Sequence, residues 1–208
     1  KTHYPLWVTQ FYENISKAVE AICLVAADCG VETLELRYAP LIHTYAGLTP
    51  RQSIRAALSG MNHARHAHPE MKLGLIVIAM RQHGPHIAKI LARQALAEAQ
   101  HLHERTGVVG FDIAGPERGN PPRVFRSAYE IARLGRLGLT AHAGEDGPVE
   151  DDSASSPPSA SGRKRYARWA PVTCTAFSST VRSSSRMSRW VKSRLDKCSA
   201  VQGGFAAW

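Results

Sequence analysis

The chain has 208 residues, of which 44% are hydrophobic, and this length suits one folded domain or one domain with an appendage. Its longest apolar run, Leu73–Met80, is too short to cross a bilayer, and the first residues lack the apolar core of a signal peptide. The four cysteines show no regular spacing of the kind that builds a disulfide framework. We therefore expect a soluble cytoplasmic protein with no membrane partner. The net charge of +9 lies mainly in residues 151–208, which carry 10 Lys and Arg against 3 Asp and Glu, whereas residues 1–150 carry 16 against 14. Any attraction to an acidic partner therefore belongs to the end of the chain.

Up to residue 145 the chain alternates amphipathic helical patterns with short apolar runs. In chain order the patterns predict a helix over Gln10–Cys29, a strand over Thr33–Pro40, a helix over Pro50–Arg65, a strand over Lys72–Arg81, a helix over Pro85–Arg105, a strand over Val108–Glu117, a helix over Pro122–Leu134 and a strand over Leu137–Glu145. Thr49 before Pro50 has the pattern of an N-cap followed by proline at the first helical position.

The predicted strands are nearly continuous in apolar residues, which is typical of strands buried on both faces. Strands of this kind that alternate with helices indicate an α/β fold with a parallel sheet, either a (β/α)8 barrel or a doubly wound sheet. In both folds, functional side chains gather where the strands end.

The stretch Gly138–Glu150, GLTAHAGEDGPVE, places His142 and Glu145 three residues apart just after an apolar run. Taken alone, it is explained by a histidine hydrogen-bonded within the core and a glutamate that caps the next helix, because so short a motif is weak evidence. The strands that precede it along the chain strengthen a functional interpretation.

Four ordered motifs, one at the end of each predicted strand, occur at Glu35–Pro40, Met80–Arg81, Gly110–Glu117 and Thr140–Glu145. They resemble the adenosine deaminase family of zinc-dependent purine deaminases in the amidohydrolase superfamily, whose patterns are E-x-R-[YF]-[SA]-P, M-R-H, G-[FIV]-D-[IL]-A-G-x-E and [TV]-x-H-A-G-E. The second motif departs from its pattern, because Gln82 stands where the family has His. The resemblance implies a partial (β/α)8 barrel of the TIM type, strands two to five.

The resemblance also implies hydrolytic deamination of adenosine or a related 6-aminopurine to the inosine-type product plus ammonia, with zinc as cofactor and a purine nucleoside or purine base as substrate. Zinc suits this reaction because it lowers the pKa of a bound water towards neutrality. By resemblance, His142 is a metal ligand, Glu145 is the catalytic acid that protonates a ring nitrogen, and Gly115 binds the base through its N–H. Glu145 must hold a proton near neutral pH, which burial in a closed pocket favours.

Two further charged residues in these motifs have mainly structural interpretations. We expect Asp112 to be hydrogen-bonded to neighbouring strands, and Arg37 to form an ion pair with Glu35, with a role as a substrate clamp left open for Arg37.

The other zinc and water-positioning residues of the family come from an H-x-H pair in the first strand, an I-G-H-G after the sixth and an S-x-N-[ST]-D-D-P loop after the eighth, which this sequence does not match. A catalytic zinc needs at least three protein ligands, so we expect this chain alone to be an inactive fragment. The histidines of His101–His103 are expected within a helix, where residues two apart diverge, and those of His63–His68 are expected to form a solvated cluster at a helix end.

Residues 151–208 differ in composition from the rest, since 13 of these 58 residues are Ser and none is His. We therefore expect a low-complexity, disordered tail after a partial barrel over residues 1–150. One interpretation is a basic segment that binds nucleic acid, which leaves a non-enzymatic interaction protein as the alternative function. We favour the other, a reading frame lost near Asp151, because the family similarity stops inside a βα unit.

Overall fold

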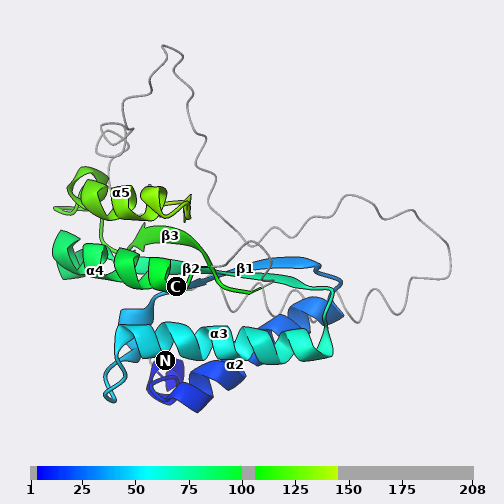
Figure 1. Ribbon diagram of the computed structural model, residues 1–208. Helices are drawn as coiled ribbons and strands as arrows, with labels where there is room; N and C mark the ends of the chain where they lie inside the picture. The colour runs from blue at the N-terminus through cyan, green and yellow to red at the C-terminus, as the bar shows by residue number, and fades with distance from the viewer. Residues whose placement is uncertain (1–3, 100–105, 145–208) are drawn as a thin grey trace, which may run out of the picture.

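The computed structural model describes residues 4–99 and 106–144. Within these residues, four parallel strands form one sheet in chain order (Figure 1). The strands are β1 (Thr33–Tyr38), β2 (Lys72–Met80), β3 (Val108–Ala114) and β4 (Gly138–Leu139). Parallel strands require a connection that returns along the sheet, and a helix makes that return before each of β2, β3 and β4.

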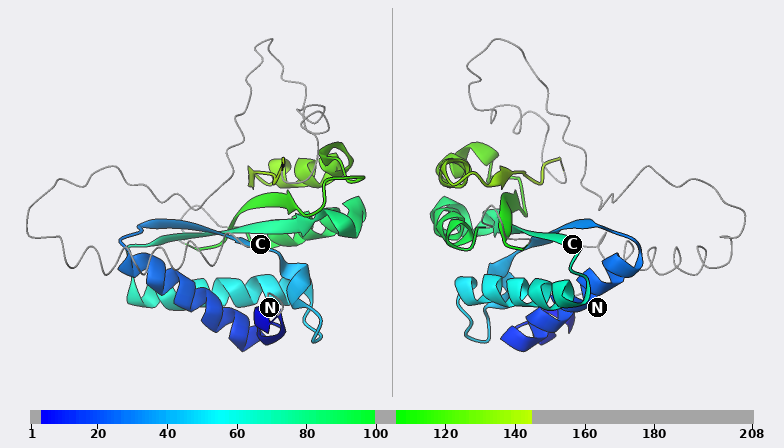
Figure 2. Two further views of the ribbon diagram at one scale, coloured as in Figure 1. Left: turned by 180° about the vertical axis from the view of Figure 1, so that it is seen from behind. Right: turned by 45° about the vertical axis from the view of Figure 1, so that its right-hand side comes forward.

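The helices pack side by side along the sheet. They are α1 (Tyr4–Val8), α2 (Tyr12–Asp28), α3 (Pro50–Ala67), α4 (Gly84–Ala97) and α5 (Arg126–Leu134), with 3-10 turns η1 (Pro40–His43), η2 (Arg81–His83) and η3 (Pro122–Phe125). In both figures α2 lies beside α3 and α4 lies beside α5 (Figures 1 and 2). None of the helices among the described residues is long and apolar enough to cross a membrane.

The two faces of the sheet carry different side chains. One face packs against the helices and supplies large apolar residues to a single core, among them Leu36, Val77 and Phe111. The register pairs Arg37 with Ile76 and Ile78 with Asp112, and these residues point to the other face because side chains alternate along a strand. Polar groups therefore stand on the face away from the helices.

The structure confirms the predicted order of helices and strands, and it corrects three details. The helix predicted to reach Arg105 ends at Ala97, and the strand predicted over Leu137–Glu145 is a regular strand only at Gly138–Leu139. The ladder nevertheless continues, because the Thr140 N–H donates to Phe111 O and the His142 N–H donates to Ile113 O. The short helix α1 was not predicted, since five residues carry too little periodicity.

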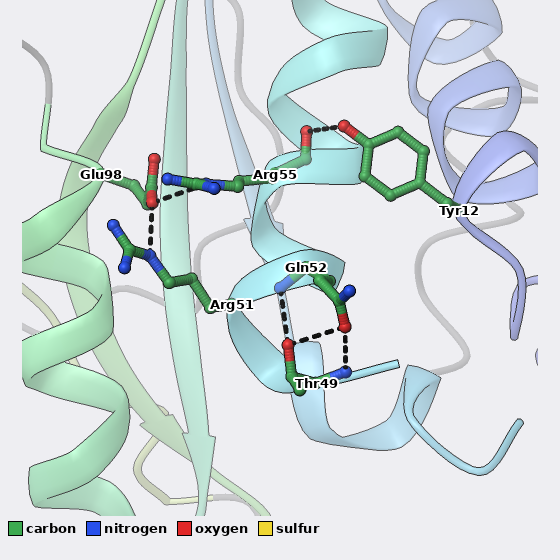
Figure 3. Close-up of polar contacts among 6 residues, drawn as sticks. All are labelled: Tyr12, Thr49, Arg51, Gln52, Arg55 and Glu98. Atoms are coloured by element: carbon green, nitrogen blue, oxygen red, sulfur yellow. Dashed lines mark hydrogen bonds and ion pairs between the residues drawn. The ribbon is translucent and has the colours of Figure 1, made fainter. Parts of the chain in front are cut away.

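Helix α3 begins at the predicted N-cap. The Thr49 side chain accepts a hydrogen bond from the Gln52 N–H, and the Gln52 side chain accepts one from the Thr49 N–H (Figure 3). In the first two turns of α3, Arg51 and Arg55 both donate to Oε1 of Glu98, at 2.7 and 2.9 Å, just beyond the last turn of α4 (Figure 3). These contacts fix the first turns of α3 against the end of α4.

Helices α2 and α3 approach most closely at Gly60, which is buried. A Cβ atom at Gly60 would overlap the backbone oxygen of Ser16 and lie 3.0 Å from the backbone nitrogen of Glu20. Backbone atoms of a helix cannot rotate away as a side chain can, so the two helices would have to separate.

We predict that Gly60→Ala lowers the free energy of unfolding by about 2 kcal/mol, although alanine favours a helix by about 1 kcal/mol over glycine. Urea denaturation followed by circular dichroism measures the change. Ser59→Ala is the matched control on the same helix and should change stability by less than about 0.5 kcal/mol. A Gly60→Ala protein as stable as its parent would show that the helices do not pack as described.

Candidate active site

Three side chains, from β1, from β3 and from the segment that follows β4, meet on the face of the sheet away from the helices. Asp112 of β3 is completely buried, and its Oδ2 lies 2.9 Å from Nδ1 of His142 and 3.5 Å from a guanidinium nitrogen of Arg37. Arg37 also donates a hydrogen bond to the hydroxyl of Thr140. The buried carboxylate thus connects β1 with the segment that follows β4.

The contact between Asp112 and His142 constrains the protonation of the imidazole. It is short, but it lacks the alignment of a hydrogen bond. Two lone pairs at 2.9 Å would repel each other, so Nδ1 of His142 must carry a hydrogen when the Asp112 carboxylate is ionised. An imidazole protonated at Nδ1 binds a metal through Nε2.

The backbone on both sides of the His142 ring is held as well. Arg81, at the end of β2, is completely buried and donates to the carbonyl of His142 at 2.7 Å and to the carbonyl of Asn120 at 2.8 Å. The hydroxyl of Tyr129 on α5 donates to the carbonyl of Thr140 at 2.7 Å. Burial raises the pKa of Tyr129, so this hydroxyl keeps its proton and remains a donor.

These contacts correct one prediction and refine another. Arg37 does not pair with Glu35, which is exposed, because its ion-pair partner is Asp112. Positions 35 and 37 share a face, but the exposed carboxylate of Glu35 is solvated, whereas the buried carboxylate of Asp112 needs a positively charged partner. The interpretation of Asp112 as a structural residue fits its burial. Its partner His142 lies in the segment that continues the ladder beside β3, whereas its partner Arg37 lies on β1, two strands away.

Gly115 follows directly after β3 with a φ of +95°, a conformation that favours glycine. A Cβ there would lie 2.5 Å from Oε1 of Gln82 and 3.3 Å from Cε of Met80. A side chain at position 115 would therefore be strained by the backbone angle, and the amide of Gln82 would have to move to make room for it.

The other predicted residues divide between those that the structure describes and those that it does not. Glu145, His101–His103 and residues 151–208 lie outside the described residues. Helix α3 ends within His63–His68, and His63 and His66 are exposed, as predicted for a solvated cluster. Within residues 4–99 and 106–144, no group of three or more His, Cys, Asp or Glu side chains has the arrangement of a metal site.

Sequence reasoning did not single out Arg81, Thr140 or Tyr129, although all three hold the segment that carries His142. Arg81 and Thr140 carried a signal, since each belongs to one of the four motifs, although the motifs assigned no role to either side chain. Tyr129 carried none, because the pairing of a helix residue with a loop carbonyl depends on tertiary structure.

Comparison with known proteins decides the family. The family model described as adenosine deaminase matches residues 7–151, which is more than half of the chain. The chain belongs to the adenosine deaminase family. Among curated relatives, it is 36% identical over 143 residues to adenosine deaminase 1 of Streptomyces coelicolor, covering 64% of this chain and 34% of the relative. It is 30% identical over 151 residues to adenosine deaminase of Clostridium kluyveri, covering 73% of this chain and 42% of the relative.

Solved structures of the adenosine deaminase and amidohydrolase kind share the fold. The adenine deaminase of Arthrobacter aurescens superposes with a TM-score of 0.57 at 25% identity, over 68% of this chain and 41% of that one. An amidohydrolase of Burkholderia ambifaria with bound Zn superposes with a TM-score of 0.56 at 25% identity, over 64% of this chain and 35% of that one. The parallel sheet is therefore part of a TIM barrel, and the chain spans less than half the length of the curated relatives it matches.

A double-mutant cycle tests the buried contact at the centre of this family site. We predict that Arg37→Met and Asp112→Asn together destabilise the protein less than the sum of the single changes, with a coupling energy of about 1 to 2 kcal/mol, because each single change leaves a poorly solvated partner. Chemical denaturation of the four proteins gives this value. The control cycle is the exposed pair Arg126 and Glu130, whose coupling should be about 0.3 kcal/mol. Additive changes at Arg37 and Asp112 would contradict the contact.

Proposed function

We propose that residues 7–151 contribute strands two to five, and part of the active site, to an enzyme that hydrolyses the 6-amino group of adenosine or a related 6-aminopurine and releases ammonia. The observation that carries this proposal is the position of His142, held at the end of the sheet by the buried Asp112 in a chain of the adenosine deaminase family. The relatives include an adenosine deaminase and an adenine deaminase, which supports a purine substrate and leaves adenosine and adenine both open.

The residues present suit one part of a zinc site. His142 has the arrangement typical of a zinc-binding histidine, with a buried carboxylate against the ring nitrogen that does not bind the metal. When bound, zinc would supply hydroxide at neutral pH by lowering the pKa of a water molecule. Because the described residues place only this one family ligand, the remaining ligands must come from other segments of the barrel.

Glu145 and Gly115 have the other two roles in this proposal, and the reaction itself shows what each must do. Hydrolysis adds the oxygen of water to the purine carbon, delivers a proton to the neighbouring ring nitrogen, and expels the amino group as ammonia. In this proposal the carboxylic acid of Glu145 delivers the proton, because it follows His142 by three residues in the sequence. The N–H of Gly115 holds the base in this proposal, because glycine has no side chain of its own to keep the base from the backbone.

The test uses a completed enzyme, in which residues 7–151 of this chain replace the matching residues of the Streptomyces coelicolor relative. We predict that the completed enzyme releases ammonia from a 6-aminopurine and contains zinc. Glu145→Gln should keep the zinc and lower kcat by at least about a hundredfold, because it removes the proton donor and leaves the ligands unchanged. His142→Ala should lose both zinc and activity.

Glu130→Gln is the control, since this carboxylate lies in an exposed ion pair on α5. It should leave zinc content and kcat unchanged. Metal analysis and an ammonia assay read the two properties separately. Near-parental activity in the Glu145→Gln enzyme would contradict the role proposed for Glu145, and retention of full zinc content in the His142→Ala enzyme would contradict the role proposed for His142.

A further inference from the structure

Among the described residues, the ladder between β3 and the segment after β4 misses one hydrogen bond, at Ile113. In a parallel pair, a residue that accepts from one partner N–H donates its own N–H to the carbonyl two residues earlier on the partner strand. Phe111 O accepts from the Thr140 N–H, and Ile113 O accepts from the His142 N–H. The Ile113 N–H should then donate to Thr140 O, but no backbone hydrogen bond joins these two described groups. Because this bond is missing, the regular strand β4 ends at Leu139.

The hydroxyl of Tyr129 takes the place of the missing hydrogen bond. It donates to Thr140 O at 2.7 Å, so this carbonyl is satisfied from α5 and not from β3. Burial raises the pKa of Tyr129, and a hydrogen bond from the backbone of Ile113 acts in the opposite direction, as an N–H that faces the phenol oxygen does. One hydroxyl therefore lies between two backbone groups that would otherwise bond to each other.

The ring of Tyr129 is held in place independently of its hydroxyl. It packs edge-on against the ring of Phe111, with centroids 5.6 Å apart and an angle of 83° between the two planes. Phe111 is completely buried in the core, and Tyr129 packs against the same core from α5. Removal of the hydroxyl alone should therefore leave the ring in place and isolate the effect of its oxygen.

The inserted hydroxyl acts on the backbone two residues before His142. Thr140 is held at two points, because Arg37 donates to its hydroxyl and Tyr129 donates to its carbonyl. A direct bond from Ile113 would require the Thr140 carbonyl to move towards β3, and His142 would move with it. The contact of 2.9 Å between Nδ1 of His142 and Oδ2 of Asp112 depends on the present place of this segment.

We propose that Tyr129 is a positioning residue of the active site, whose hydroxyl holds the ladder open at Thr140 and thereby sets the place of the His142 imidazole. This inference rests on the proposed function, in which His142 binds zinc. In this role Tyr129 acts through the backbone of Thr140 and not on the metal or the base. Loss of its hydroxyl should therefore weaken the hold on zinc and leave binding of the base unchanged.

The first experiment tests the inserted hydroxyl in the full chain, without reference to activity. Scalar couplings across hydrogen bonds, measured between amide nitrogen and carbonyl carbon in the labelled chain, report which backbone groups are bonded. We expect no coupling between the Ile113 nitrogen and the Thr140 carbonyl carbon in the parent, and a measurable coupling in Tyr129→Phe. A coupling in the parent would overturn the proposal. Its absence in Tyr129→Phe would do so too, because the hydroxyl would then not be what keeps the ladder open.

The second experiment measures zinc release to a chelator, and steady-state kinetics, in the completed enzyme. Tyr129→Phe should raise the rate of zinc release at least about tenfold, the size of effect typical of groups that orient a metal ligand. The value of kcat should fall by a similar factor, whereas KM should stay within about twofold of the parent. A rate of zinc release within about twofold of the parent would overturn the proposal.

Tyr12→Phe is the matched control, because the Tyr12 hydroxyl also donates to a backbone carbonyl, that of Arg55 on α3 (Figure 3). It should leave zinc release and kcat unchanged, and an equal effect in both variants would refute a positioning role for Tyr129. If the completed enzyme deaminates no 6-aminopurine, the proposed function fails. An active completed enzyme that Tyr129→Phe leaves unchanged refutes the role of Tyr129 alone.

Discussion

The buried carboxylate of Asp112 is the group on which the rest of the site depends. It has no exposed surface, yet it lies against the imidazole of His142, in the segment after β4, and against the guanidinium of Arg37, in β1. A charged carboxylate in such a place is stable only with partners of this kind, and removal of either partner leaves a charge without compensation. The burial of the Asp112 carboxylate thus costs stability, and the need to keep a partner beside it fixes the orientation of His142.

The position of Asp112 in turn depends on the way the sheet is supported. Its strand is flanked by β2 and β4, and the neighbours Phe111 and Ile113 enter the core beneath the helices. Alternation along β3 then requires Asp112 to point the other way, into the face where the ends of the strands gather. The helices thus orient Asp112 indirectly, because they bury its two neighbours on β3. How closely α2 and α3 pack depends on their approach at Gly60.

The sequence predicts the order of the helices and strands because buried parallel strands and amphipathic helices have distinct periods. It predicts that His142 and Gly115 lie at strand ends, because the motifs follow the apolar runs directly. It does not predict that Arg37 pairs with Asp112 instead of Glu35, since this choice depends on which carboxylate is buried in the folded chain. The position of the Gln82 amide in front of Gly115 was equally hidden, because the two residues come from segments that no local pattern connects.

The ring nitrogens of His142 offer the most direct test that Asp112 orients this histidine for a metal. Nitrogen-15 shifts of the histidine side chains, recorded on the labelled chain well above the ordinary histidine pKa, distinguish a protonated from an unprotonated ring nitrogen. The account predicts that His142 carries its hydrogen on Nδ1 and leaves Nε2 unprotonated, and that Asp112→Leu abolishes this preference. A wild-type His142 protonated at Nε2, or one averaged between the two forms like the exposed His66, would contradict it.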